Sequence, residues 1–387
     1  MHDAPVVQWS EDGQACSARW RSERGAPPPA KVVIADDRMT ADDAYGLACQ
    51  GIALLWRGDF QNARQMLSAL ASRADRPPRK PGKTRPAAAP APRSPAEAFT
   101  LERQARAQRA RTLGMLLVPL DIDYGIPLRR APDMREGCME AYGPQQDASV
   151  VSLRELLGVL GAHEWRRKGI DLPSFGMRIH PHYGVFAPIR REYVDLVAEA
   201  PFPAAIATSS IAFDIGTGTG VLAAVLARRG IDRVVATDQD PRALACAREN
   251  LERLGLAAQV DVVQADLFPE GRAALVVCNP PWVPARPSSP LEHGIYDPES
   301  RMLNGFLRGL PAHLEPGGEG WLILSDLAEH LGLRTRQELL AAVEGAALKV
   351  VGRIDARPRH PKASDATDPL HLARVAEVTS LWRLSVV

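Results

Sequence analysis

The sequence Ile-Ala-Phe-Asp-Ile-Gly-Thr-Gly-Thr-Gly-Val, at Ile211–Val221, decides the fold. Five residues typical of a strand lead into a glycine-rich turn, and the helix-forming segment Leu222–Arg229 follows at once. Gly216, Gly218 and Gly220 remove side chains where the backbone must bend sharply and where a ligand must approach it closely. A strand, a tight turn and a helix N-terminus in this order predict a ligand site.

From residue 211 onward, strand and helix patterns alternate regularly. We predict strands at 211–215, 233–237, 259–264, 274–278, 320–325, 348–355 and 375–383, and helices at 219–229, 241–254, 299–314 and 333–343. This alternation with short links indicates the α/β class, with a doubly wound, seven-stranded, Rossmann-like sheet. The last two strands are joined by residues 356–372 without a predicted helix, which lets the final strand run antiparallel.

The length of 387 residues favours more than one domain. We divide the chain into a mixed and helical N-terminal region (1–75), a basic, proline-rich linker (76–98), a helical candidate for substrate recognition (99–174) and the α/β domain (175–387). Within the linker, Arg76 to Pro95 hold seven prolines, six basic residues and no acidic one, which predicts a flexible tether. Its charge serves either solvation or a contact with nucleic acid.

The region before the α/β domain is expected to be mainly helical. Apolar residues recur at helical spacing from Tyr45 to Trp56 and again from Phe60 to Leu70, which predicts a helical hairpin that begins at Thr40. A further helix is predicted from Phe99 to Val118, where Pro119 ends it.

The composition, with 45% hydrophobic and 24% charged residues and a formal net charge of +1, is that of a globular protein. No window approaches the roughly 18 consecutive apolar residues of a membrane span, and the N-terminus lacks a signal-peptide pattern. The five cysteines are scattered and lack a Cys-x-x-Cys spacing, so we predict reduced thiols and a cytoplasmic location. The pair His180 and His182 has no carboxylate or cysteine cluster beside it, and we predict no metal site.

Two acidic residues follow the strands that neighbour the glycine turn. Asp238 closes the second strand, where a carboxylate can accept hydrogen bonds from both hydroxyls of a ribose. Asp266 ends the third strand, where a carboxylate can accept a hydrogen bond from an adenine amine while Leu267 flanks the ring. Val221 stands where a dinucleotide fingerprint would place its third glycine, which disfavours a nicotinamide cofactor. The expected ligand is an adenosine without phosphates.

The segment Asn279-Pro280-Pro281-Trp282 follows the fourth strand. Two prolines fix the backbone and remove two amide donors, which leaves the carbonyl of Pro280 and the amide oxygen of Asn279 as acceptors. Trp282 offers a flat face for stacking. Two acceptors beside a stacking wall can recognise a planar NH2 group, either an amide or a nucleobase amine. Such bonds leave the nitrogen lone pair directed at an incoming methyl group.

Taken together, Asp214 to Gly220, Asp238, Asp266 and Asn279 to Trp282 resemble the motif set of the class I S-adenosylmethionine-dependent methyltransferases, in the amino-methylating branch. The resemblance covers roughly residues 175–387 and is greatest for HemK-type glutamine-N5 methyltransferases, whose Asn-Pro-Pro precedes an aromatic residue, usually Tyr. The chain departs from that pattern in its Trp282 and in its N-terminal half.

The resemblance implies S-adenosylmethionine as cofactor and assigns a role to each matching residue. It implies that the methionine part and the turn are held by Asp214, Gly216, Gly218 and Gly220, the ribose by Asp238, the adenine by Asp266 and Leu267, and the acceptor nitrogen by Asn279, Pro280 and Trp282. The reaction would be an in-line displacement at the sulfonium methyl, driven by positioning and desolvation, without a metal.

Loops beyond the carboxyl ends of the strands are candidates for holding a macromolecular substrate. The substrate-binding candidates are Pro281, Arg357, Arg359 and Lys362, with solvated loops as the alternative. The first expected acceptor is a glutamine of a protein such as a translation factor, and the second is an exocyclic amine of RNA or DNA. A non-catalytic adaptor that binds nucleic acid is a third hypothesis, which the intact acceptor motif disfavours.

Overall fold

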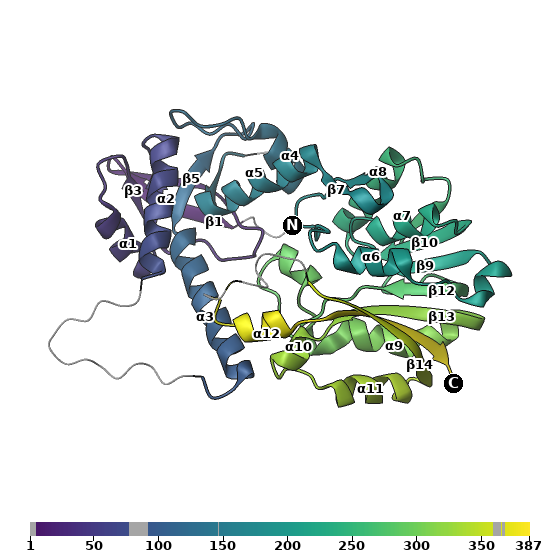
Figure 1. The fold of residues 1–387 in the computed structure, drawn as a ribbon. Coiled ribbons are helices and arrows are strands. Elements are labelled where there is room, and N and C mark those ends of the chain that lie inside the picture. Colours follow the sequence, from purple (N-terminus) through teal and green to yellow (C-terminus); the bar gives the residue numbers. More distant parts are fainter. Residues whose placement is uncertain (1–4, 77–91, 146, 359–364, 366–367) are drawn as a thin grey trace. The chain divides into compact units, whose positions relative to one another are not determined.

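The computed structural model describes residues 5–76, 92–145, 147–358, 365 and 368–387. The chain divides into two compact units, one drawn from residues 1–92 and 100–164 and the other from residues 93–99 and 165–387 (Figure 1). Most of the predicted tether, residues 77–91, lies outside the described residues, and helix α3 already begins at Pro95.

The first unit is built around a six-stranded sheet with the order β1-β2-β6-β5-β4-β3. Its strands are β1 Val6–Glu11, β2 Gln14–Arg21, β3 Lys31–Ala35, β4 Ile52–Trp56, β5 Leu116–Leu120 and β6 Ser149–Ser152. The helices that start or end in this unit are α1 Ala41–Cys49, α2 Phe60–Ala74, α3 Pro95–Gly114, α4 Arg135–Tyr142 and α5 Leu153–Lys168.

The prediction of a mainly helical N-terminal domain is therefore wrong. Gly51, with φ +76°, follows helix α1, and the next residues form strand β4 in place of the predicted helix. Ala53 to Trp56 are all buried, and a strand buried on both faces is a continuous apolar run that also fits helical spacing. The prediction of a helix that continues to Val118 is wrong for the same reason, since Leu116, Leu117 and Val118 are also fully buried and lie in strand β5.

The second unit contains the predicted doubly wound sheet. Its seven strands have the order β11-β10-β9-β12-β13-β15-β14. They are β9 Ile211–Ile215, β10 Arg233–Asp238, β11 Val260–Gln264, β12 Ala273–Cys278, β13 Leu314–Ser325, β14 Leu348–Ala356 and β15 Thr379–Val386. Strand β15 runs antiparallel to both of its neighbours, which confirms the predicted direction of the last strand.

Helices connect and cover these strands. They are α6 Glu192–Glu199, α7 Val221–Arg228, α8 Pro241–Arg253, α9 Arg301–His313, α10 Leu327–His330, α11 Arg336–Gly345 and α12 His371–Ala376. A small hairpin, β7 Ile170–Leu172 and β8 Met177–Ile179, precedes the sheet, and short 3-10 turns are η1 Pro173–Phe175, η2 Ala204–Ala207, η3 Pro290–Gly294 and η4 Pro298–Ser300. Helix α12 lies in the connection for which no helix was predicted, so that expectation was wrong.

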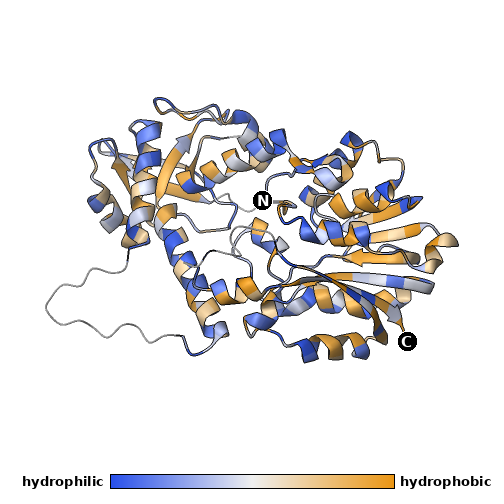
Figure 2. Cartoon of the chain, in the orientation of Figure 1, coloured by the Kyte–Doolittle hydropathy of each residue, from blue (hydrophilic) through white to orange (hydrophobic). Residues whose placement is uncertain are grey.

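Alternate residues of the central strands pack into two apolar layers. On one side of the sheet, Ala212, Leu275 and Val277 pack with residues of α6 and α7. On the other side, Phe213 and Val276 pack with residues of α9 and α11. The two sets of helices lie on opposite faces of the sheet in Figure 1, and the central strand β12 is hydrophobic along its length in Figure 2. The central strands β9 and β12 are buried on both faces, as expected of parallel strands.

The strand order reverses direction between β9 and β12, which are parallel neighbours. Ligands of open α/β sheets bind in the crevice beyond the carboxyl ends of the strands at such a point. The glycine turn follows β9, and Asn279 follows β12.

Two glycines of the turn give a matched test of its packing. Gly220 has φ +80°, and a Cβ there would lie 3.2 Å from Ala247, whereas a Cβ at Gly218, with φ +56°, would meet nothing within 4 Å. Gly218→Ala should lower the free energy of unfolding by about 1 kcal/mol, the backbone cost alone. Gly220→Ala should lower it by about 2 kcal/mol or more, because overpacking adds to that cost. Urea unfolding without cofactor measures both, and equal losses would contradict this packing.

Candidate active site

Asp214 holds the glycine turn against the sheet. Its side chain is buried, and its Oδ2 accepts hydrogen bonds from Thr217 Oγ1 at 2.7 Å and from the amide of Ala223 at 3.0 Å. The amides of Gly216 and Thr217 donate to the carbonyl of Thr237, on strand β10, at 2.9 and 2.8 Å. Residues from β9, β10 and helix α7 therefore fix the backbone of the turn. Burial raises the pKa of Asp214 to about 6, because a charged carboxylate loses its hydration there.

Asp238 is attached to the same turn. It closes strand β10, and its Oδ2 accepts a hydrogen bond from the amide of Gly218 at 3.0 Å while its Oδ1 accepts one from the amide of Asp240 at 3.0 Å. Burial is the main cause that raises the pKa of Asp238. Each carboxylate oxygen keeps further acceptor capacity, which is what a ribose with two hydroxyl donors requires. Asp240 caps helix α8, as its position before Pro241 suggests.

Asp266 and Leu267 follow strand β11. Asp266 is exposed and pairs with the guanidinium of Arg301 at 2.8 Å, a contact that the sequence did not reveal. An exposed pair of this kind contributes little to stability. Leu267 has φ +78°, an unusual conformation for leucine, and its carbonyl accepts a hydrogen bond from Thr237 Oγ1 at 2.5 Å. A Cβ on Gly305 would lie 2.6 Å from Leu267 Cδ1, so the glycine makes room for this side chain.

The acceptor motif is held by a bond within itself. Trp282 donates from its indole Nε1 to Oδ1 of Asn279 at 2.9 Å. An amide oxygen has two lone pairs, so Asn279 Oδ1 can still accept one hydrogen bond from a substrate. Pro280 is buried and Pro281 half-buried beside it.

Arg190 covers the ring of Trp282, a contact that could not be predicted from the sequence. Its guanidinium carbon lies 4.8 Å from the ring centroid. Nε pairs with Glu192 at 2.7 Å and Nη1 with Glu377 at 2.9 Å. Ser325 Oγ donates to Glu377 at 2.6 Å. A desolvated contact between a cation and an aromatic ring contributes about 1–2 kcal/mol. In the sequence Arg190 stands among charged residues at a helix start, a pattern typical of solvated surface.

Neighbouring strands bring the predicted residues to one edge. Ile215 pairs with Thr237 on one side and with Cys278 on the other, so the glycine turn, Asp238 and Asn279 begin at the same level. Arg357 is exposed at the end of β14, which lies three strands from β12, or roughly 14 Å at the usual spacing. Arg359 and Lys362 lie outside the described residues.

The His-x-His pair makes contacts within the fold. Nδ1 of His180 lies 2.6 Å from the carbonyl oxygen of Arg166, and Nε2 of His182 lies 2.6 Å from the carboxylate of Glu249. Within the described ranges, no group of three or more His, Cys, Asp or Glu could hold a metal ion. In the same part of the chain, no helix is both long enough and apolar enough to cross a membrane.

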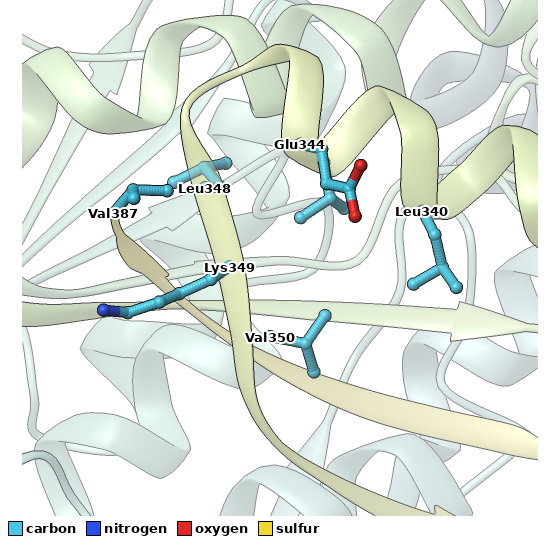
Figure 3. A pocket seen from close by; sticks show the side chains of 7 residues that line it. Leu340, Glu344, Leu348, Lys349, Val350 and Val387 are labelled. Atoms are coloured by element: carbon cyan, nitrogen blue, oxygen red, sulfur yellow. The ribbon is translucent and has the colours of Figure 1, made fainter.

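A surface pocket lies away from this site, between helix α11 and strand β14 (Figure 3). Leu340, Val343, Leu348 and Val387 are among the residues that line it. Leu348 begins β14, which runs parallel to β13, so the pocket opens at the amino edge of the sheet. The glycine turn and Asn279 lie at the opposite, carboxyl edge.

Comparison with known families accounts for this arrangement of motifs. Residues 176–344 match the family described as Methyltransferase small domain. This part of the chain is a methyltransferase domain. The resemblance to S-adenosylmethionine-dependent methyltransferases that the motifs showed is confirmed for this part of the chain.

Relatives of the methyltransferase domain include enzymes that are named for protein substrates. A release factor glutamine methyltransferase of Cereibacter sphaeroides is 35% identical over 161 residues, which cover 38% of this chain and 56% of that protein. A ribosomal protein L11 methyltransferase of Pelotomaculum thermopropionicum is 55% identical over 69 residues, which cover 17% of this chain and 22% of that protein. A methyltransferase structure from Pyrococcus furiosus has a TM-score of 0.38 at 20% identity, covering 60% of this chain and 99% of that one. The chain thus spans little more than half of the first relative.

The raised pKa of Asp214 predicts a pH dependence of stability. Its folded pKa of about 6 exceeds the ordinary value of 3.8, so the folded state binds the proton more tightly than the unfolded state. The wild-type free energy of unfolding, relative to that of Asp214→Asn, should be highest below about pH 4 and should fall by about 3 kcal/mol as the pH rises through about 6. Urea unfolding of both proteins across this range measures the difference, which isolates Asp214. A difference that does not change with pH would contradict the assignment.

Proposed function

We propose that the chain is an S-adenosylmethionine-dependent N-methyltransferase whose acceptor is the side-chain amide of a protein glutamine. The observation that carries this proposal is the position of Asn279 and Pro280 at the end of β12, across the strand-order reversal from the glycine turn. The glutamine-methylating relative supports the choice of acceptor.

The residues after β9 and β10 fit the cofactor. Gly218 leaves open space where a Cβ would stand, and Asp238 combines burial with unused acceptor capacity. Asp238 would hold the ribose, Asp266 and Leu267 would flank the adenine, and the turn from Gly216 to Gly220 would hold the methionine part. When bound, the cofactor supplies an electrophilic methyl group on a sulfonium sulfur. Asp214 is bonded to Thr217 and Ala223, so its contribution is to hold the turn.

The acceptor residues supply orientation. Asn279 Oδ1 and the carbonyl of Pro280 would each accept one hydrogen of the substrate NH2 group, which turns the nitrogen lone pair toward the methyl. Trp282 would confine the plane of the amide. Asn279 and Pro280 would thereby hold the nitrogen in line with the methyl group that the bound cofactor would supply, and the methylated nitrogen would lose its proton to water. This series of steps would require no strong base from the protein.

We favour an amide over a nucleobase as the acceptor. Arg190 covers one face of the Trp282 ring, which leaves a base at most the other face for stacking. Stacking on aromatic side chains carries much of the recognition of an extruded base, whereas a glutamine side chain needs mainly the two acceptors. Methylation of nucleic acid is therefore the alternative outcome of the experiment that tests the proposal.

Tritiated methyl transfer into cell extract tests the proposal. The full chain is incubated with labelled S-adenosylmethionine and extract, and the products are divided between protease and nuclease digestion. The label should be released by protease and survive nuclease. Release of the label by nuclease would show that the acceptor is a nucleobase amine and not a glutamine. Absence of any methyl transfer would contradict the proposal that the chain is an N-methyltransferase.

The same assay with Asn279→Ala tests the acceptor motif. Loss of one preorganised hydrogen-bonding group should lower kcat about 100-fold, while calorimetry should show an unchanged affinity for the cofactor. Asn304→Ala, at a half-buried asparagine on helix α9, is the control and should keep wild-type turnover. Full activity of Asn279→Ala would show that the side chain of Asn279 does not orient the acceptor.

A further inference from the structure

The orientation of the Asn279 side chain decides whether the acceptor site can work. Amide oxygen and nitrogen are nearly equal in shape, and a flipped Asn279 would direct an NH2 donor at the NH2 group of the substrate. The site therefore needs a partner that distinguishes the two ends. Trp282 Nε1, at 2.9 Å, is such a partner, because an indole nitrogen only donates. It selects the oxygen.

The ring of Trp282 is itself held by a cation. The guanidinium of Arg190 lies over the ring at 4.8 Å from the centroid. Its Nη2 is buried without a hydrogen-bond partner, so the ring contact supplements the two ion pairs that Arg190 makes. Trp282 also lies at the margin of three apolar clusters, where packing on several sides restricts its rotation.

Two carboxylates set the orientation of Arg190. The side chains of Glu192 and Glu377 are only 6% and 3% exposed, and they come from separate parts of the unit, helix α6 and the residues before β15. Ser325, the last residue of β13, donates to Glu377 and accepts from the amide of Leu327 at 3.0 Å. A planar guanidinium with donors in a fixed fork can satisfy two carboxylates and lie flat on a ring, whereas an ammonium group cannot.

We propose that Arg190, Trp282 and Asn279 form a positioning relay, in which Arg190 fixes the plane of the indole and the indole N–H fixes the oxygen of Asn279 toward the substrate. Arg190 is a positioning residue that acts through Trp282 without touching the substrate. The inference rests on the proposed function for its purpose, although the relay itself is a property of the folded chain.

If the relay operates, full activity requires a tryptophan at position 282. HemK-type enzymes usually carry tyrosine at this place, but a tyrosine or phenylalanine at position 282 has no donor where the indole nitrogen lies. Trp282→Tyr and Trp282→Phe should both lower kcat at least about tenfold and change cofactor affinity little. Wild-type kcat in Trp282→Tyr would overturn the relay.

Arg190→Lys keeps the charge beside the two glutamates and removes the planar fork. It should lower kcat in the wild-type background and have no further effect in Trp282→Phe, since the relay is already broken there. Arg191→Lys, at the exposed neighbouring arginine, is the matched control. Equal fractional losses from Arg190→Lys in both backgrounds would assign Arg190 a purely structural role.

Hydrogen exchange of the indole protons tests the relay without turnover. The Trp282 signal is identified by its loss in Trp282→Phe, and its exchange is followed by NMR in wild-type protein, Arg190→Lys and Arg191→Lys. Only Arg190→Lys should accelerate it, at least about tenfold, at unchanged urea midpoint. An unchanged exchange rate would overturn the relay even in an active enzyme, whereas a wild-type protein that transfers no methyl would overturn the proposed function alone.

Discussion

A buried carboxylate organises the carboxyl edge of the sheet. Asp214 binds Thr217 and Ala223 and thereby joins strand β9, the glycine turn and the start of helix α7. Its burial is costly, as the raised pKa shows, and two hydrogen bonds offset part of that cost. With the turn fixed, the amide of Gly218 reaches Asp238 on the neighbouring strand. The proposed cofactor site is thus preorganised by bonds within the protein.

The other side of the crevice is organised by charge. Arg190 is paired with two carboxylates of low exposure. Removal of one partner from such a group leaves a buried charge without compensation. The group connects helix α6 with the ends of β13 and β15 and with the acceptor motif. Burial of Arg190, Glu192 and Glu377 costs desolvation free energy. This cost fits a role of the group in orienting Trp282 better than a role in stabilising the fold.

The features that could be predicted from the sequence are local ones. Asp238 ends strand β10 and Asn279 directly follows strand β12, so their common edge follows from the parallel alternation of strands and helices. Strands β4 and β5 could not be distinguished from helices, because a strand buried on both faces has no alternating pattern. Glu377 lies 187 residues from Arg190, and a contact of that kind leaves no pattern in a single sequence. The bond from Trp282 to Asn279 spans three residues, yet it depends on a rotamer that spacing alone does not determine.

The most direct test of the account is a calorimetric titration of the full chain with S-adenosylmethionine. The account predicts one binding site per chain, a large loss of affinity in Asp238→Ala, and nearly unchanged affinity in Asn279→Ala, because the first residue serves the donor and the second the acceptor. Absence of binding to the wild-type protein, or equal losses in both variants, would contradict the division of the crevice into a donor side and an acceptor side.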